Sequence, residues 1–163
     1  MTNSQDTALV HVRKTVPEDA VAVSRFLKDL ERAGKRNLPS GAEFVLNTYI
    51  CNDLLVGSHV ATDENGRPFG IQVLLREESP NPGDDSQVWG GIGTHVAEDA
   101  ARRGTGRALF AATRQAAQNA GLLHIDATIG ETNAEGLAYY GAMGFETYKT
   151  LPGRICKRFD ITC

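Results

Sequence analysis

Residues 102–109 read RRGTGRAL, and this stretch decides the fold that we predict. Gly104 and Gly106 flank one residue, arginines stand on both sides, and a helical pattern follows. The first N–H groups of a helix lack internal acceptors, and the helix dipole there stabilises an anion by roughly 0.3–1 kcal/mol. Glycines let the backbone approach such an anion, and arginines add charge-assisted hydrogen bonds. The stretch therefore predicts a phosphate site, a nucleic-acid contact or merely a solvated helix start.

Two better-known phosphate motifs do not fit these residues. A P-loop requires GxxxxGK followed by Ser or Thr, which the chain does not contain. A dinucleotide-binding loop requires a third glycine, but Leu109 stands at that position after Gly104 and Val96 stands there after Gly91. An isolated GxG is a weak motif, so the surrounding sequence has to decide between the alternatives.

The composition is that of an ordinary globular domain with a slight negative charge. Of the 163 residues, 41% are hydrophobic and 23% are charged, and the formal net charge is −3. This length suits one domain over residues 1–163, whose polar residues 1–8 we expect to be flexible. A general nucleic-acid-binding protein would be strongly basic, so we expect no nucleic-acid partner.

The cysteines and the first residues indicate the compartment. Cys51, Cys156 and Cys163 are odd in number and widely spaced, which fits neither a disulfide framework nor a zinc site. Residues 1–10 do not resemble a secretory signal, and no window approaches the ~20 apolar residues of a membrane span. We therefore expect a cytoplasmic protein with reduced thiols and with no metal or membrane partner.

Helix and strand signals alternate along the chain. Thr15 with Glu18, and Thr132 with Glu135, have the spacing of capping boxes that open helices. Strand–helix–strand units of this kind argue for a mixed sheet with helices on both faces. The expected strands are residues 9–13, 54–62, 69–75, 88–96 and 122–129 and a pair within 145–161. The expected helices run from residue 15 to Gly34, over 42–49, from the RRGTGR stretch to Gly121 and from 132 to Gly144.

Two apolar stripes at helical spacing predict which helix faces are buried. The first consists of Val16, Ala20, Val23, Leu27 and Leu30, and the second of Leu109, Ala112, Ala116 and Ala120.

The strand before the RRGTGR stretch contains three glycines. Residues 88–96 read VWGGIGTHV, with glycine at positions 90, 91 and 93. Glycine weakens a strand and usually marks a bulge or a close approach by another molecule. We therefore expect one of these two features within residues 90–93.

The residues around this loop resemble a known family. From Val96 to Leu109, GxG follows a valine by eight residues and continues as Arg-Ala-Leu, which resembles the acetyl-CoA loop of GCN5-related N-acetyltransferases. Asn133, Tyr140 and Gly144-Phe145 also match the spacing of that family. Residues 12–20 resemble its common start, so the resemblance covers about residues 10–150. One departure is Ala101, where the family usually has Gln or Arg.

The resemblance implies an α/β (α+β) fold with a mixed, mostly antiparallel sheet of six or seven strands. It implies that acetyl-CoA donates an acetyl group to a primary amine. The Val96 N–H would polarise the thioester carbonyl, and Tyr140 would give the leaving thiolate a proton. Tyr139 is expected to fill a packing role. Asn133 would cap its helix and contact the cofactor. The implied cofactor-binding residues are Val96, Arg102, Arg103, Gly104, Thr105, Gly106, Arg107 and Asn133.

The general base that the amine requires remains open. Family members often carry Glu or His on the strand before the loop, but Gly90, Ile92 and Thr94 occupy the corresponding face here. Strand alternation should turn His95 to the other face unless a bulge rotates it. The remaining alternatives are His59, Asp126, Glu43 and a chain of water molecules.

Three functions are compatible with these residues. The first is acetylation of a small-molecule amine, such as an amino acid, an antibiotic or a metabolite, by direct attack in a ternary complex. The second is acetylation of peptide or protein N-termini, and the third is a non-catalytic acyl-CoA sensor, against which the retained Tyr140 argues. No cysteine lies in a motif, which disfavours an acetyl-enzyme. Family members are often dimers, so the resemblance also allows a homodimer.

Overall fold

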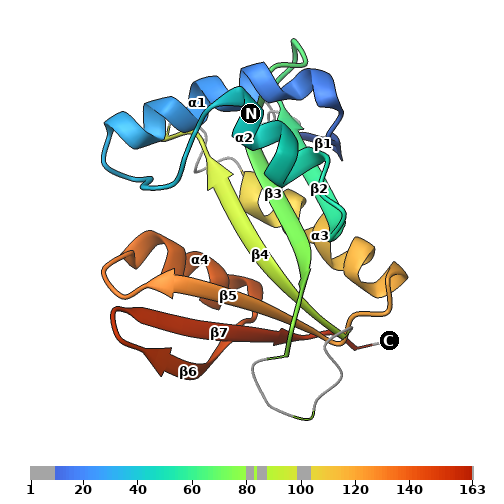
Figure 1. Cartoon of the computed structure of the whole chain (residues 1–163), viewed down its shortest axis with the longest axis vertical. Helices are drawn as coiled ribbons and strands as arrows, with labels where there is room; N and C mark the ends of the chain where they lie inside the picture. The colour runs from blue at the N-terminus through green and yellow to red at the C-terminus, as the bar shows by residue number, and fades with distance from the viewer. Residues whose placement is uncertain (1–9, 80–82, 84–87, 99–103, 163) are drawn as a thin grey trace, which may run out of the picture.

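One seven-stranded sheet runs through the computed structural model, which describes residues 10–79, 83, 88–98 and 104–162 (Figure 1). The strand order is β1-β2-β3-β4-β5-β7-β6, and each neighbouring pair is antiparallel except β4 and β5, which are parallel. The predicted mixed, mostly antiparallel sheet is confirmed. Residues 1–8, which we expected to be flexible, lie outside the described residues. The strands are β1 (His11–Lys14), β2 (Leu55–Thr62), β3 (Pro68–Glu77), β4 (Trp89–Val96), β5 (His124–Gly130), β6 (Glu146–Leu151) and β7 (Arg154–Asp160).

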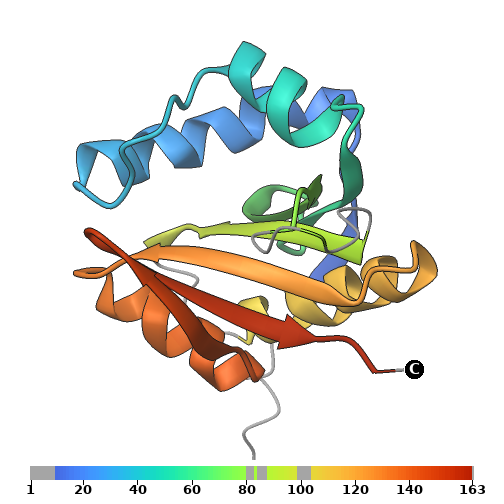
Figure 2. The ribbon, with the colours of Figure 1, turned by 60° about the horizontal axis from the view of Figure 1, so that its bottom comes forward.

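Helices cover both faces of this sheet, as predicted (Figure 2). Ile71 and Val73 of β3 belong to the core on the side of α1 and η3. Leu74 of β3 and Ile125 of β5 belong to the core on the side of α3 and α4. This division follows from the alternation of side chains along a strand. The helices are η2 (Pro17–Asp19), α1 (Ala20–Arg32), α2 (Ala42–Phe44), η3 (Val45–Ile50), α3 (Thr105–Asn119) and α4 (Ala134–Met143).

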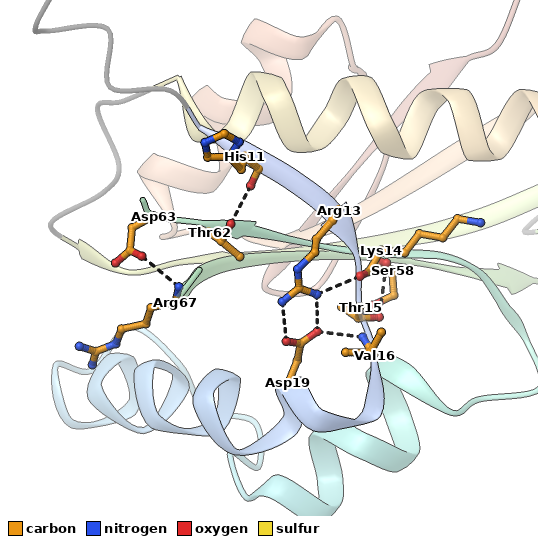
Figure 3. A network of polar contacts seen from close by, with 10 residues as sticks. All are labelled: His11, Arg13, Lys14, Thr15, Val16, Asp19, Ser58, Thr62, Asp63 and Arg67. Atoms are coloured by element: carbon orange, nitrogen blue, oxygen red, sulfur yellow. Dashed lines mark hydrogen bonds and ion pairs between the residues drawn. The ribbon is translucent and has the colours of Figure 1, made fainter. Parts of the chain in front are cut away.

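The first helix begins differently from the prediction (Figure 3). Among the described residues Thr15 and Glu18 form no capping box, because the Thr15 hydroxyl donates to the Ser58 carbonyl at 3.4 Å. Asp19 caps the start instead, since its carboxylate accepts the Val16 N–H at 2.8 Å. Val16 was placed in the buried stripe but is 41% exposed, because the η2 turn separates it from α1. The other stripe members, Ala20, Val23, Leu27 and Leu30, are buried as predicted.

Arg13 and Asp19 form a two-pronged ion pair at this helix start (Figure 3). Two guanidinium nitrogens donate to the two carboxylate oxygens, each at 2.8 Å, and Asp19 is 6% exposed. The hydrogen bonds from Arg13 lower the pKa of Asp19 below its ordinary value and outweigh its burial. An acid with a lowered pKa stabilises the fold above its unfolded-state pKa, and this contribution is lost as pH falls through the folded pKa.

Asp19→Asn is therefore expected to lower the free energy of unfolding by about 2 kcal/mol at neutral pH. The loss should shrink at an acidic pH below the ordinary carboxyl pKa of about 4, because the wild-type carboxylate becomes protonated as pH falls through its lowered pKa. Urea denaturation at the two pH values measures this difference. The control is Asp29→Asn in the exposed Asp29–Arg32 pair, with an expected effect below about 0.5 kcal/mol. An equal loss from Asp19→Asn at both pH values would contradict the assigned role of the ion pair.

The later helices keep their predicted ends but not all their predicted buried faces. Gly121 and Gly144 follow α3 and α4 with φ values of 76° and 104°, as expected of helix stops. On α3 the bulk of Leu109 and Phe110 sets the inward face, and the predicted alanines 112, 116 and 120 are only partly buried. The buried residues of α3 are Thr105, Leu109, Phe110, Thr113 and Ala117.

The predicted caps and the second helix also need correction. Thr132 does not cap α4; Asn133 does, because its side-chain oxygen accepts the Gly136 N–H at 3.0 Å. Residues 42–49 are helical as predicted, but from Val45 to Ile50 the helix is a π-helix. The cap expected of Asn133 is thus confirmed and the Thr132–Glu135 capping box is wrong; adjacent Thr and Asn residues are both good N-caps by sequence alone.

The glycines of β4 have packing reasons, and β4 pairs with β3 without a bulge. The register is continuous along β4, so the expected bulge is wrong for this pair. A Cβ at Gly90 would lie 2.8 Å from Leu122, and a Cβ at Gly91 would collide with the Glu77 carboxyl. At Gly93 the nearest described atom would be 3.8 Å away. For Gly93 the alternative expectation, a close approach by another molecule, therefore stays a prediction.

None of the described helices is long and apolar enough to cross a bilayer. Within the same residues, no group of three His, Cys, Asp or Glu side chains could hold a metal ion. Cys51 is exposed and Cys156 is buried, both as free thiols, and Cys163 lies outside the described residues.

Candidate active site

The strands β4 and β5 pair at one end and then separate (Figure 1). Their last pair joins Gly91 to Asp126, and no described residue beyond it continues this ladder. β4 continues from Ile92 to Val96 alongside β3 alone. An opening therefore begins in the middle of the sheet, immediately after Gly91.

Backbone N–H groups of β4 point into this opening. The Ala97 N–H donates to the Phe69 carbonyl of β3 at 2.8 Å. N–H groups alternate in direction along a strand, so those of Val96 and Thr94 point away from β3. The Val96 N–H thus points towards the side where β5 has separated. This is the group that, by the family resemblance, would donate to the thioester carbonyl.

The start of α3 lies next to the end of β4. Gly70 pairs with Val96, and a Cβ on Gly70 would lie 3.3 Å from Thr105 and 3.5 Å from the Val96 side chain. Gly104 has a φ of 72°, and the Ala108 N–H donates to its carbonyl at 3.1 Å. The helix itself provides no acceptors for the N–H groups of its first turn. Ala101, Arg102 and Arg103 lie outside the described residues.

Gly106 is in close contact with Tyr139 of α4. A Cβ at Gly106 would collide with the Tyr139 ring, whose hydroxyl donates to the Gly106 carbonyl at 2.8 Å. The same hydroxyl accepts from Gln72 Nε2 at 2.9 Å. Arg107 is exposed beside this contact, and its charge acts on the Tyr139 hydroxyl. Tyr139 therefore ties α4 to the first turn of α3, in keeping with the packing role expected for it.

Tyr140 enters the same network from the next position of α4. Its hydroxyl lies 2.9 Å from Thr94 Oγ1, and Gln72 Nε2 donates to that same oxygen at 2.9 Å. Tyr140 is 7% exposed, and burial raises its pKa above the ordinary value. The hydroxyl therefore holds its proton at neutral pH, next to a residue of β4 that lies beyond the last pair with β5.

Asn133 occupies the exposed start of α4. Close to it, Lys35 forms ion pairs with Glu135 of α4 at 3.1 Å and with Glu98, just after β4, at 3.5 Å. The start of α4 is thereby connected through Lys35 to the end of β4. The cap is the role of Asn133 that the described contacts explain, and a cofactor contact remains a prediction.

His95 lies on the opposite face of β4 from Thr94, as strand alternation predicts. Its ring stacks on Tyr49 with 5.8 Å between ring centroids, and Nε2 lies 3.3 Å from a guanidinium nitrogen of the buried Arg36. Burial and the positive charge of Arg36 lower the pKa of His95 to about 4. His95 is therefore neutral at pH 7 and is a weak base.

The other candidate bases differ in their distance from the opening. His59 is buried on β2, beyond β3, and Glu43 is exposed on α2. Asp126 lies at the opening, but both its oxygens are occupied. Tyr148 donates to one at 2.7 Å, and Thr128 donates to the other at 2.8 Å. Among the three, Asp126 alone lies at the last pair between β4 and β5.

Glu77 is a residue of this site that the sequence motifs did not reveal. Its carboxyl lies against Gly91, the partner of Asp126, although the residue as a whole is exposed at the end of β3. Burial of the carboxyl and the charge of Asp126 raise the pKa of Glu77 to about 7. Both acids line a pocket of about 130 Å³ together with Trp89 and Tyr148. No motif marks Glu77, because only the register between β3 and β4 brings it there.

The model of the acetyltransferase (GNAT) family matches residues 26–145, and no curated protein matches. Because the match covers most of the 163 residues, the chain belongs to the acetyltransferase (GNAT) family. It is accordingly an N-acetyltransferase, as the resemblance implied.

Solved structures with the same fold include three acetyltransferases. The N-acetyltransferase from Staphylococcus aureus Mu50 aligns with a TM-score of 0.76 and 16% identity, over 94% of this chain and 99% of the other. A GCN5-related N-acetyltransferase from Kribbella flavida gives 0.73 and 21%, over 93% and 97%. A phosphinothricin acetyltransferase from Sinorhizobium meliloti in complex with AcCoA gives 0.74 and 17%, over 93% and 88%. At such low identity these matches establish the fold alone.

Proposed function

We propose that this protein is a cytoplasmic, single-domain enzyme that acetylates the primary amine of a small molecule by direct attack in a ternary complex with acetyl-CoA. One observation carries the proposal: a buried tyrosine hydroxyl and two carboxyl groups lie at the residues of β4 where it separates from β5. The Tyr140 hydroxyl lies at Thr94, and the acids Glu77 and Asp126 lie at Gly91. A small amine suits a pocket of about 130 Å³ better than a folded protein surface does.

The first turn of α3 fits the diphosphate of acetyl-CoA. A Cβ on Gly104 would meet no atom of the described residues within 4 Å, which leaves room above N–H groups to which the helix offers no acceptor. The exposed Arg107 adds a positive charge at the same turn. When bound, acetyl-CoA supplies an activated thioester. The residues proposed to hold it are Val96, Arg102, Arg103, Gly104, Thr105, Gly106, Arg107 and Asn133.

The chain's own groups divide the catalytic work in this proposal. The Val96 N–H stabilises negative charge on the carbonyl oxygen, because it is a fixed donor that points into the opening. The Tyr140 hydroxyl holds the proton that the departing sulfur requires. Gln72 and Thr94 fix the position of that hydroxyl, since Gln72 donates to Thr94 and the Thr94 oxygen contacts Tyr140.

A screen for acceptors tests this function. The purified protein is mixed with acetyl-CoA and with separate panels of small amines, amino acids and peptides with free N-termini, and thiol release is followed. We expect release with at least one small amine and a product heavier by one acetyl group. Release with peptides alone would replace the proposal by peptide acetylation. Tight acetyl-CoA binding without release in any panel would favour the sensor.

A further inference from the structure

We propose that Glu77 is a catalytic residue: it removes a proton from the ammonium group of the acceptor, and together with Asp126 it forms the subsite for a positively charged primary amine. This inference rests on the proposed function, because it assigns the base of that reaction. The sequence alone left the base among His95, His59, Asp126, Glu43 and water.

The position of the two acids supports this assignment. The Glu77 carboxyl lies against Gly91, and Gly91 is paired with Asp126 at the point where β4 and β5 separate. At Gly93, the next residue on this face of β4, the nearest described atom to an added Cβ would be His95 Nε2 at 3.8 Å, so a side chain there would make only ordinary contact.

The spacing along β4 fits a base on one side of the reaction and an acid on the other. Gly91 and Thr94 are three residues apart, which is about 10 Å along a strand. A base on the nitrogen and an acid on the sulfur are separated by two hydrogen bonds and one attack distance, each about 3 Å, and by the carbon–sulfur bond. The strand positions that these two groups contact, Gly91 for Glu77 and Thr94 for Tyr140, have a spacing of this order and face opposite sides of the sheet.

The two acids have different tasks because their partners differ. Asp126 accepts hydrogen bonds on both oxygens, from Tyr148 and Thr128, so it is held in place. Among the described residues, no hydrogen bond reaches the Glu77 carboxyl, which can therefore accept the proton of a ligand. Asp126 supplies fixed negative charge beside it.

The charges around the pair favour a cation. With its pKa raised to about 7, Glu77 is only partly ionised at neutral pH, because burial and Asp126 oppose its charge. A bound ammonium would relieve this repulsion. The other titratable or charged side chains that line the pocket are Glu78 of the β3 end, Tyr148 and Lys149 of β6 and Cys156 of β7. Lys149 is not among the groups that shift Glu77.

Atoms and protons balance in this step. The ammonium gives one proton to Glu77, and Glu77 later releases it to solvent. The freed nitrogen lone pair forms the bond to the acetyl carbon, and the carbon–sulfur bond breaks. The sulfur takes the Tyr140 proton, and the second proton lost by the nitrogen returns to Tyr140. One proton is released for each acetyl group transferred.

Two variants test the assignment through the pH profile of kcat/KM. The wild type should lose activity as pH falls through about 7. Glu77→Gln should no longer show this acidic limb of the pH profile. Its rate at pH 7 with an alkylamine should fall by about 10²–10⁴-fold. It should lose much less with an aromatic amine, which is already neutral. Asp126→Asn should move the limb to lower pH, because the charge that raises the Glu77 pKa is gone.

A second measurement does not depend on activity. An acid with a raised folded pKa costs stability as pH rises from its unfolded pKa through its folded pKa. The melting temperature of Glu77→Gln minus that of the wild type should therefore be larger at about pH 9 than at about pH 5. The matched control Glu64→Gln, in the exposed turn after β2, should follow the wild type. Acetyl-CoA should raise the melting temperature of all three proteins.

The outcomes separate this inference from the proposed function. An active wild type whose rate, pH profile and pH-dependent stability are unchanged by Glu77→Gln would overturn the base and leave the acetylation of amines intact. A wild type that acetylates no amine would overturn the proposed function, and the base with it. Loss of the acidic limb in Glu77→Gln, with its shift in Asp126→Asn, would establish Glu77 as the base and Asp126 as the fixed charge beside it.

Discussion

Tyr140→Phe is expected to lower kcat by about 10²–10⁴-fold and to leave the affinity for acetyl-CoA unchanged. The hydroxyl lies 2.9 Å from Thr94 Oγ1, and burial raises its pKa, so it keeps a proton for the departing sulfur. Phe preserves the ring contacts with Tyr139 and Phe145 and removes only that proton and its hydrogen bond. Steady-state kinetics, together with calorimetric titration of acetyl-CoA, separate the two effects.

The neighbouring Tyr139 provides the matched control. Tyr139→Phe removes the hydrogen bond to the Gly106 carbonyl and leaves Gln72 with one partner fewer. We expect a loss of about 1 kcal/mol in stability and weaker acetyl-CoA binding, with kcat little changed. If both variants lose kcat to the same extent, Tyr140 is not the proton donor.

Gly104→Glu is expected to abolish the stabilisation of the protein by acetyl-CoA. At a concentration of 100 times Kd, a ligand adds about 2.7 kcal/mol, which corresponds to about 5–10 °C in melting temperature for a domain of this size. The substitution would place a carboxylate at the start of α3, where negative charge repels the diphosphate. It would also strain a backbone whose φ is 72°.

Gly66→Glu controls for that strain. Gly66 has a φ of 80° in the turn between β2 and β3, and within the described part of the chain a Cβ there would meet no atom within 4 Å, as at Gly104. Both variants should lose similar intrinsic stability, but Gly66→Glu should keep the full shift with acetyl-CoA. A full shift in Gly104→Glu would remove the start of α3 from the cofactor site.

Local sequence signals predicted the elements well and the contacts between them poorly. Gly34, Gly121 and Gly144 follow their helices as expected, because a positive φ is a property of one residue. The cap of α1 was wrong because Thr15 finds a partner on β2, Ser58, which is distant in sequence. Local spacing contains no information about such partners.

Some residues of the candidate site could likewise be predicted from the sequence, and others could not. The spacing from Val96 to Gly106 and on to Tyr140 lies within the chain order, so a family resemblance could identify those residues. Glu77 could not be found in this manner, because its place depends on the register of β3 against β4 and on the pairing of Gly91 with Asp126. The lowered pKa of His95 likewise depends on burial in the folded chain and then on Arg36, which follows α1 and is remote in sequence.

A crystal structure of the protein with CoA and an amine acceptor would test the assigned site without relying on kinetics. We expect the diphosphate at residues 104–107, the sulfur within hydrogen-bond reach of the Tyr140 hydroxyl, and the acceptor nitrogen at the Glu77 carboxyl. A diphosphate bound elsewhere, or a sulfur that lies outside the opening between β4 and β5, would contradict this assignment.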